Sequence, residues 1–395
     1  MKPVVFLQLI LLLLLTAACS STVSRRNVEG PVPVDHSAAE IPENQLLNVS
    51  IAVFDPGVLP EDEKRANGLS MEIRKAEARY MPEQLRATME KTGYWGAVRV
   101  VPSEITGAEL LVSGTILESN GDQLDLKIEA HDASGRQWFS KEYRDASDAG
   151  YYQLNDYSED AFQPLYNAIA NDLARFFKTL SAEEITGIRR VAELRFAADI
   201  APAAFADYLQ QGEQGEYTVV HLPSYDDPMF ARVQAIRERD LLMIDTLNGH
   251  FDNFHREMQQ PYTEWRKARS DEFEKQRELE KSALNRTLLG VAAIVGAIFV
   301  DAAGSSYSDS ISDVLVLGGA AAIKSGMDKR SEASIHRDSI EELGLSFSSE
   351  AQPLVLEVDG KTVELTGSAE AQYDQWRVLI GQIYATETGF SGSLD

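Results

Sequence analysis

Residues 110–143 read LLVSGTILESNGDQLDLKIEAHDASGRQWFSKEY, and this stretch decides the fold. Its central part, residues 123–131, alternates apolar and charged residues with the period of two that is typical of a strand with one buried face. Asn120-Gly121 and Ser134-Gly135 are turn dipeptides that flank this strand on both sides. We therefore predict three successive strands joined by tight turns, which form an antiparallel meander.

The flanking sequence adds further elements to this meander. The stretch SIAVFDP at residues 50–56 belongs to a strand that Pro56-Gly57 ends, and residues 94–101 form another strand. Helical patterns cover residues 69–92, with a break or a fresh start expected at Pro82. A second helical pattern covers residues 158–180, where apolar residues recur at spacings of three and four. The prediction is an α+β unit over residues 47–180, with a mixed or antiparallel sheet and helices on one face.

This order of elements resembles a superfamily of periplasmic lipoprotein domains that includes the curli secretion lipoprotein, the TolB amino-terminal domain and the penicillin-binding-protein activators. The resemblance rests on the strand SIAVFDP and on the pattern of residues 108–143, and it covers roughly residues 47–180. It implies a scaffold surface for assembling envelope machinery, without a catalytic signature. The alternative is an unrelated small α+β domain.

The amino terminus has the three parts of a secretion signal. Lys2 precedes an apolar segment at residues 4–15, which is too short to span a bilayer, and the small residues Thr16-Ala17-Ala18 lead into Cys19, the only cysteine of the chain. This arrangement resembles the lipobox of bacterial lipoproteins. It implies a signal peptide at residues 1–18, cleavage between Ala18 and Cys19, and lipid attachment to Cys19. The alternative is an ordinary signal peptide followed by an incidental cysteine.

The lipobox resemblance also implies a location. Ser20 follows the lipidated cysteine, and in Gram-negative lipoproteins the absence of Asp at that position favours the periplasmic face of the outer membrane; in a Gram-positive host the same signal would place the chain on the cell membrane. Residues 19–46 contain three prolines and no helical or alternating pattern. We expect them to form a lipidated tether.

Composition restricts the partners. The 395 residues carry 37 basic and 62 acidic side chains, a formal net charge of −25. Nucleic acid is therefore an unfavourable partner, because its binders need a basic face. A single cysteine permits neither an intrachain disulfide nor a cysteine-based zinc site.

Residues 181–286 are predicted to be a helical region. Ser181 and Glu184 fit a capping box, residues 211–228 read as a loop, and residues 229–260 are helical. Residues 264–286 interleave seven basic and six acidic residues, which favours a solvated helix supported by ion pairs three or four residues apart. A coiled-coil arm is the alternative, although no heptad is sustained.

Residues 287–326 are predicted to form an apolar helical hairpin of small residues. Residues 287–300 and 314–323 carry no charged side chain and flank a polar turn. Small residues recur at four-residue spacing and are candidate helix-packing or membrane-contact positions: Gly290, Ala292, Gly296, Gly318, Ala322 and Gly326. Three alternatives stay open for this hairpin. A conventional two-span anchor is disfavoured, because both helices are short for a bilayer; the others are burial in the protein's own core or a self-association surface, and partial insertion into the bilayer.

Residues 327–395 are expected to form a β-hairpin around Asp359-Gly360 and an amphipathic helix at residues 369–386. A hairpin and one helix bury little apolar surface alone, so this segment should dock on the rest of the chain.

No catalytic, cofactor-binding or metal-binding motif stands out, and we expect neither a cofactor nor a metal. The sequence favours a lipid-anchored, non-enzymatic protein that acts as a scaffold in an envelope assembly or secretion complex. Its expected partners are the membrane, through lipid on Cys19, and an envelope protein or a second copy of this chain. The alternative is a hydrolase of the cell wall or a surface polymer that uses Asp55, Glu61 and Asp62 after the first strand.

Overall fold

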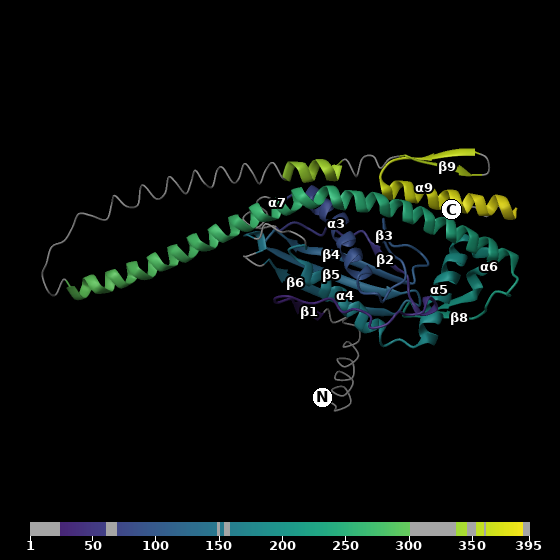
Figure 1. Cartoon of the computed structure of the whole chain (residues 1–395), viewed down its shortest axis with the longest axis horizontal. Helices are drawn as coiled ribbons and strands as arrows, with labels where there is room; N and C mark the ends of the chain where they lie inside the picture. The colour runs from purple at the N-terminus through teal and green to yellow at the C-terminus, as the bar shows by residue number, and fades with distance from the viewer. Residues whose placement is uncertain are drawn as a thin grey trace, which may run out of the picture.

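The computed structural model describes residues 24–60, 69–147, 151–153, 159–300, 337–345, 353–358 and 361–389. A six-stranded mixed sheet with the order β1-β6-β5-β4-β2-β3 forms its centre (Figure 1). The strands are β1 (Ser24–Asn27), β2 (Val49–Ala52), β3 (Val98–Val101), β4 (Leu110–Ser119), β5 (Gln123–Asp132) and β6 (Gln137–Ala146). The predicted α+β class is confirmed.

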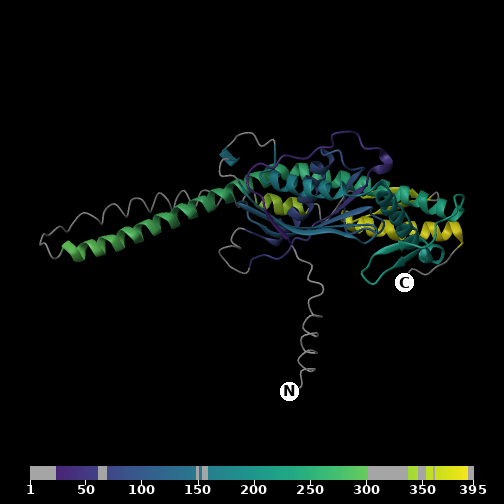
Figure 2. The same cartoon turned by 90° about the horizontal axis from the view of Figure 1, so that it is seen from below.

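The predicted meander is confirmed as β4, β5 and β6, which pair antiparallel. β2 pairs parallel with both β3 and β4, and β1 pairs parallel with β6. Buried and half-exposed residues alternate along β4, so one face of the sheet carries most of the core. Helices α3 (Met71–Glu90) and α4 (Gln163–Phe177) cover this face, together with part of the long helix α7 (Pro228–Val300), which runs along one side of the sheet in Figure 2.

The break expected at Pro82 is wrong, because α3 runs through it. Proline lacks an amide hydrogen and leaves the carbonyl four residues earlier without its helical donor. That carbonyl belongs to Ala78, and it accepts a hydrogen bond of 2.9 Å from the amide of Phe54, just after β2. The strand thus supplies the donor that Pro82 lacks.

The expectation of a tether is wrong for residues 24–46, which lie on the folded body. β1 adds an edge strand to the sheet, and Val28 is buried. The chain then follows α4, where Asn167 Nδ2 donates to the carbonyl of Val32 and Asn171 Nδ2 donates to that of Pro33, each at 2.8 Å. These two amides stand one helical turn apart, so they hold an extended strap along the helix.

The helical region begins as predicted. α5 (Ala182–Ile200) starts with the capping box of Ser181 and Glu184, and the short α6 (Pro202–Phe205) follows. Where a loop was expected, β7 (Leu209–Gln211) and β8 (Tyr217–Val219) form a small hairpin whose Tyr217 amide donates to the carbonyl of Ser134. The long helix α7 then runs without a break across the expected boundary at residues 286 and 287.

The carboxy-terminal segment docks as predicted. β9 (Leu354–Val358) and β10 (Lys361–Leu365) form the hairpin, and α9 (Ala369–Thr388) packs on α7 and α5. Asp240 of α7 is the polar centre of this contact, because its carboxylate accepts from Trp376 Nε1 at 3.0 Å and from the Tyr373 hydroxyl at 3.4 Å. Arg377 Nη1 lies 3.4 Å from the same carboxylate.

Asp240→Ala should destabilise this contact, because it leaves the indole N–H of Trp376 and the hydroxyl of Tyr373 without their acceptor. We expect a loss of about 2–3 kcal/mol in the free energy of unfolding, measured by urea denaturation, with earlier proteolytic cleavage of α9. The control is Asp374→Ala on the exposed face of α9, which should cost less than about 0.5 kcal/mol. Equal losses in the two variants would contradict the assigned role of Asp240.

Candidate functional site

The candidate site is the place where α7 leaves the sheet, which we call the arm junction. It consists of Tyr262, Arg266, Arg269 and Arg277 of α7, Glu77 of α3, Asp160, which lies just before α4, and the β4–β5 turn at Gly121-Asp122. Figure 1 shows α7 crossing the body and continuing beyond it as a single helix. The contacts at the junction therefore set the direction in which the distal part of α7 points.

The buried stripe of α7 explains why charged residues enter the core here. Phe254, Met258, Tyr262 and Trp265 recur at spacings of three and four and are all buried. Arg266 is one helical turn after Tyr262, so its side chain extends the same face into the core. The predicted solvated helix is wrong for this first part of residues 264–286. A guanidinium in such a place needs an acceptor, because burial of an unpaired charge is costly.

Arg266 finds that acceptor in Asp160. The two guanidinium nitrogens Nη1 and Nη2 donate to the two carboxylate oxygens at 3.0 and 2.8 Å, and the side chains are only 1% and 2% exposed. Burial alone would raise the pKa of Asp160, but the charge and hydrogen bonds of Arg266 outweigh it and hold this pKa below its ordinary value. The Arg266 guanidinium also lies 4.3 Å from the ring centre of Tyr262. The pair is therefore ionised, and the Arg266 guanidinium is held between the Asp160 carboxylate and the Tyr262 ring.

Glu77 forms a second buried polar contact with α7. Its Oε1 accepts from the hydroxyls of Ser119 at 2.6 Å and Tyr262 at 2.7 Å. Burial raises the pKa of Glu77, although Arg74 and these two hydroxyls oppose the rise. The equally buried Arg74 lies with Nε 3.7 Å from Glu77 Oε2, beyond hydrogen-bond distance. Glu77 thus ties α3, β4 and α7 together.

The β4–β5 turn closes the junction at one end of these two interior strands. Gly121 has a φ of 92°, and a Cβ there would lie 2.7 Å from the Cβ of Arg269, so only glycine allows α7 to approach this closely. The next residue, Asp122, accepts from Arg277 at 2.9 and 3.2 Å. The turn dipeptide that the sequence showed therefore also forms the support for the helix.

His255 lies on the same segment of α7. Its ring stacks on Tyr80 with 4.3 Å between centres, and its Nε2 lies 3.1 Å from Gln84 Oε1. Burial lowers the pKa of His255 to about 4, so the imidazole is neutral at neutral pH. It acts as a packing group between α7 and α3. Among the described residues, no group of three or more His, Cys, Asp or Glu side chains could hold a metal ion.

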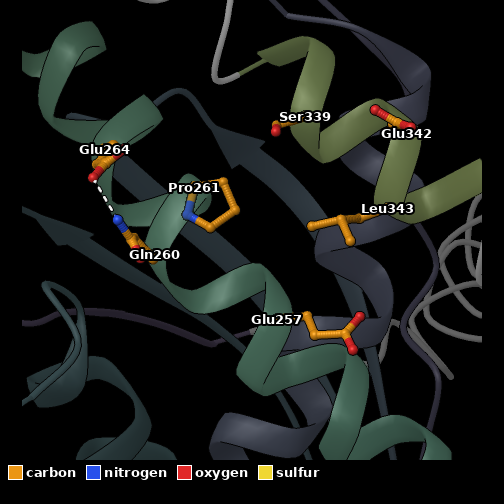
Figure 3. Close-up of a pocket in the computed structure, with 7 residues that line it drawn as sticks. All are labelled: Glu257, Gln260, Pro261, Glu264, Ser339, Glu342 and Leu343. Carbon is orange, nitrogen blue, oxygen red and sulfur yellow. Dashed lines mark hydrogen bonds between the residues drawn. The ribbon is translucent and has the colours of Figure 1, made fainter.

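A pocket of about 460 Å³ lies on α7 beside this segment (Figure 3). The helix over residues 337–345 forms its opposite wall, and the buried Ile340 attaches that helix to the core. The lining residues are Glu257, Gln260, Pro261, Glu264, Ser339, Glu342 and Leu343. Gln260 Nε2 donates to Glu264 Oε1 at 3.1 Å across one turn. The pocket is acidic and open, and it suits a cationic group better than an anionic one.

The structure brings few of the sequence-predicted site residues together. Asp55 is exposed, and its Oδ1 accepts from the amide of Gly57 at 2.8 Å, so it stabilises the turn after β2. Glu61 and Asp62, the other acids of the hydrolase alternative, lie outside the described residues. So do Ala18, Cys19, Gly318, Ala322 and Gly326. The structure places Gly290, Ala292 and Gly296 in the distal end of α7.

Sequence reasoning missed Glu77, Asp160 and Arg266. Two of them carried a signal, because Glu77 lies one turn from both Ile73 and Tyr80, and Arg266 continues the stripe of Tyr262. A charge on the apolar stripe of a helix indicates a buried polar contact. Asp160 lies in a loop and carried no such signal.

No family model, no curated protein and no solved structure matches this chain. In the part of the chain that the structure describes, no helix combines the length and hydropathy that a membrane crossing requires.

Asp160→Asn should weaken the arm junction strongly, because it leaves the Arg266 guanidinium buried beside a neutral amide. We expect a loss of about 3–5 kcal/mol in the free energy of unfolding by urea denaturation. The matched control is Asp122→Asn, which removes the charge partner of the half-exposed Arg277 and should cost less than about 1 kcal/mol. If the two variants lose the same free energy of unfolding, the Arg266–Asp160 ion pair is not the main contact of the arm junction.

Asp145 of β6 provides a test by pH. Burial raises its pKa from 3.8 to about 7, and the charge of the neighbouring Asp160 adds to the rise. The folded protein therefore holds a proton that the unfolded chain releases near pH 4, so this group destabilises the fold progressively as pH rises from about 4 to 7. Asp145→Asn should be more stable than the unmodified protein by up to about 4 kcal/mol above pH 7 and by much less at pH 4. If the difference in free energy of unfolding between the two proteins does not change with pH, the pKa of Asp145 is not raised in the folded protein.

Proposed function

We propose that this protein is a lipid-anchored, non-enzymatic component of the cell envelope, which acts as a scaffold and presents a helical arm to its surroundings. The arm is the part of α7 distal to the junction, residues 278–300. In this proposal the sheet and its helices form a rigid body, and Cys19 carries the lipid.

The observation that carries the proposal is the continuity of α7. One helix of 73 residues begins in the core with α5 and α9, crosses the sheet domain at the arm junction and continues beyond the body (Figure 1). At 1.5 Å per residue, it is about 110 Å long. A helix that is buried at one end and projects at the other holds its far end at a defined distance from the body, which suits a scaffold.

The polar groups of the junction support the same function. The side chains of Glu77, Asp160 and Arg266 are buried. Glu77 contacts Tyr262 of α7 and Ser119 of β4, and Asp160 pairs with Arg266 of α7. Side chains that are closed to solvent can stabilise the placement of α7 on the sheet, but a polymeric substrate cannot reach them. The exposed Asp55 is engaged in its own turn.

The lipobox supports the anchor. Because residues 24–46 are held on the body, the chain between the lipid and β1 is short, spanning residues 20–23. At about 3.5 Å per residue, the five residue steps from Cys19 to Ser24 reach at most about 18 Å. The sheet body would therefore lie close to the membrane surface that carries the lipid.

Cys19→Ser should move the protein from the membrane fraction to the soluble fraction when it is expressed in a Gram-negative host, while Ser21→Ala, a control in the same segment, should remain with the membranes.

A photo-reactive residue at position 284 of the arm should cross-link to an envelope component, whereas one at the fully exposed Tyr225 of the body should not. Membrane association that survives Cys19→Ser would contradict the anchor. Peptidoglycan hydrolysis that Asp55→Ala abolishes would replace the scaffold with the hydrolase.

A further inference from the structure

We propose that the β1 edge of the sheet is the face of the body that lies on the membrane, where its exposed cations bind the phosphate groups of anionic phospholipids. We call this surface the basic edge, and it consists of Arg25 and Arg26 of β1, Lys141 and Arg144 of β6, and Arg175 of α4. The inference rests on the proposed function, because the lipid on Cys19 is what brings the body to the bilayer. It deepens that function by assigning the side of the body that faces the lipid.

The position of β1 in the chain brings this edge to the anchor. β1 is an edge strand of the sheet and pairs only with β6 (Figure 1). It begins at Ser24, and Arg26 follows two residues later. At about 3.5 Å per residue, the seven residue steps from Cys19 to Arg26 reach at most about 25 Å. A lipid on Cys19 therefore holds this edge within reach of the headgroups.

Asp172 of α4 lies at the centre of the basic edge, where three cations surround its carboxylate. Oδ1 accepts from Arg26 Nη1 at 2.9 Å and from Arg175 Nη1 at 2.5 Å, and Oδ2 accepts from Lys141 Nζ at 2.5 Å. Burial alone would raise the pKa of Asp172, but the hydrogen bonds from Lys141 and the Tyr143 hydroxyl hold it below its ordinary value. In the part of the chain that the structure describes, no second carboxylate pairs with these three cations, so three positive charges face one negative charge.

The cations of the basic edge face the solvent, whereas their carboxylate partners are more buried. The side chain of Arg175 is 66% exposed and that of Asp172 only 6%. Arg144 is 43% exposed and its partner Asp125 8%, and the ion pair of Arg25 has the same order. An approaching surface therefore meets the guanidinium groups first. Guanidinium groups pair with phosphate oxygens through two parallel hydrogen bonds, which suits a phospholipid headgroup.

The charge of the surrounding residues distinguishes this face from the rest of the protein. Residues 24–35, 137–146 and 163–178 carry six basic and five acidic side chains, and Asp125, the partner of Arg144, makes the two numbers equal. The excess of 25 acidic side chains therefore lies elsewhere in the chain. Because an anionic bilayer repels acidic faces, a tethered body is expected to turn this neutral face with its outward cations towards the lipid.

The single cysteine allows the anchor to be supplied chemically. A protein of residues 19–395 contains every described residue, and Cys19 is its only cysteine, so it couples at this position to a maleimide-bearing lipid in a vesicle. The readout is the rate at which phenylglyoxal modifies single arginines, measured by mass spectrometry. Arg175 reports on the basic edge. Arg256 of α7, whose side chain is 65% exposed and also ion-paired within its helix, is the matched control.

On vesicles of phosphatidylcholine with phosphatidylglycerol, Arg175 should be modified several-fold more slowly than on vesicles of phosphatidylcholine alone. High salt should abolish this difference, because added ions screen the contact, and the rate at Arg256 should be the same on both vesicles. In Arg175→Gln, the protection of Arg25 by phosphatidylglycerol should weaken by about fivefold, since each basic residue near an anionic surface strengthens binding by about that factor. Arg256→Gln should leave the protection of Arg25 unchanged.

Three results would overturn the inference. The first is an equal rate at Arg175 on the two kinds of vesicle, and the second is equal protection of Arg175 and Arg256. The third is protection of Arg175 without vesicles, which would make a soluble anion the ligand if inorganic phosphate causes it, or a second copy the partner if it grows with protein concentration. Because the anchor is chemical here, the outcome does not depend on whether cells attach lipid to Cys19, and the anchor and the basic edge can fail separately.

Discussion

The ion pair between Arg266 and Asp160 is the contact on which the rest of the structure depends. It joins α7 to the segment that leads into α4, and it is fully buried and bidentate. A buried pair of this kind contributes little net stability compared with apolar residues, but loss of one partner is costly. Its main effect is to allow only one placement of α7 on the sheet, because a shift of the helix would leave two buried charges unpaired.

The neighbouring contacts repeat this constraint at different depths. Glu77 accepts from Tyr262 in the core, Gly121 allows the close approach of Arg269, and Asp122 pairs with Arg277 at the β4–β5 turn. Together they guide about four turns of α7 from the core to the surface. A helix that is held at several points along its length leaves the body in a defined direction, which is the property that a presenting arm requires.

Periodicity predicted those parts of the fold whose partners are near in the sequence. The β4–β6 meander and the stripe of α9 follow from alternation and from three- and four-residue spacing. Contacts between distant residues escaped prediction. The strap at residues 24–46 depends on Asn167 and Asn171, and the continuity of α3 through Pro82 depends on the amide of Phe54. The charges of residues 264–286 looked solvated because the acceptor of Arg266 is 106 residues away.

The central claim is that α7 is one rigid element from the body to the end of the arm, and a distance measurement tests it most directly. Spin labels at Leu242→Cys and Leu284→Cys, in the chain of residues 20–395, are separated by 42 residues of the same helix. Pulsed electron spin resonance should give a narrow distribution centred near about 63 Å, because each residue adds 1.5 Å. A broad distribution, or one centred well below that distance, would mean that α7 bends at the arm junction and would contradict the account.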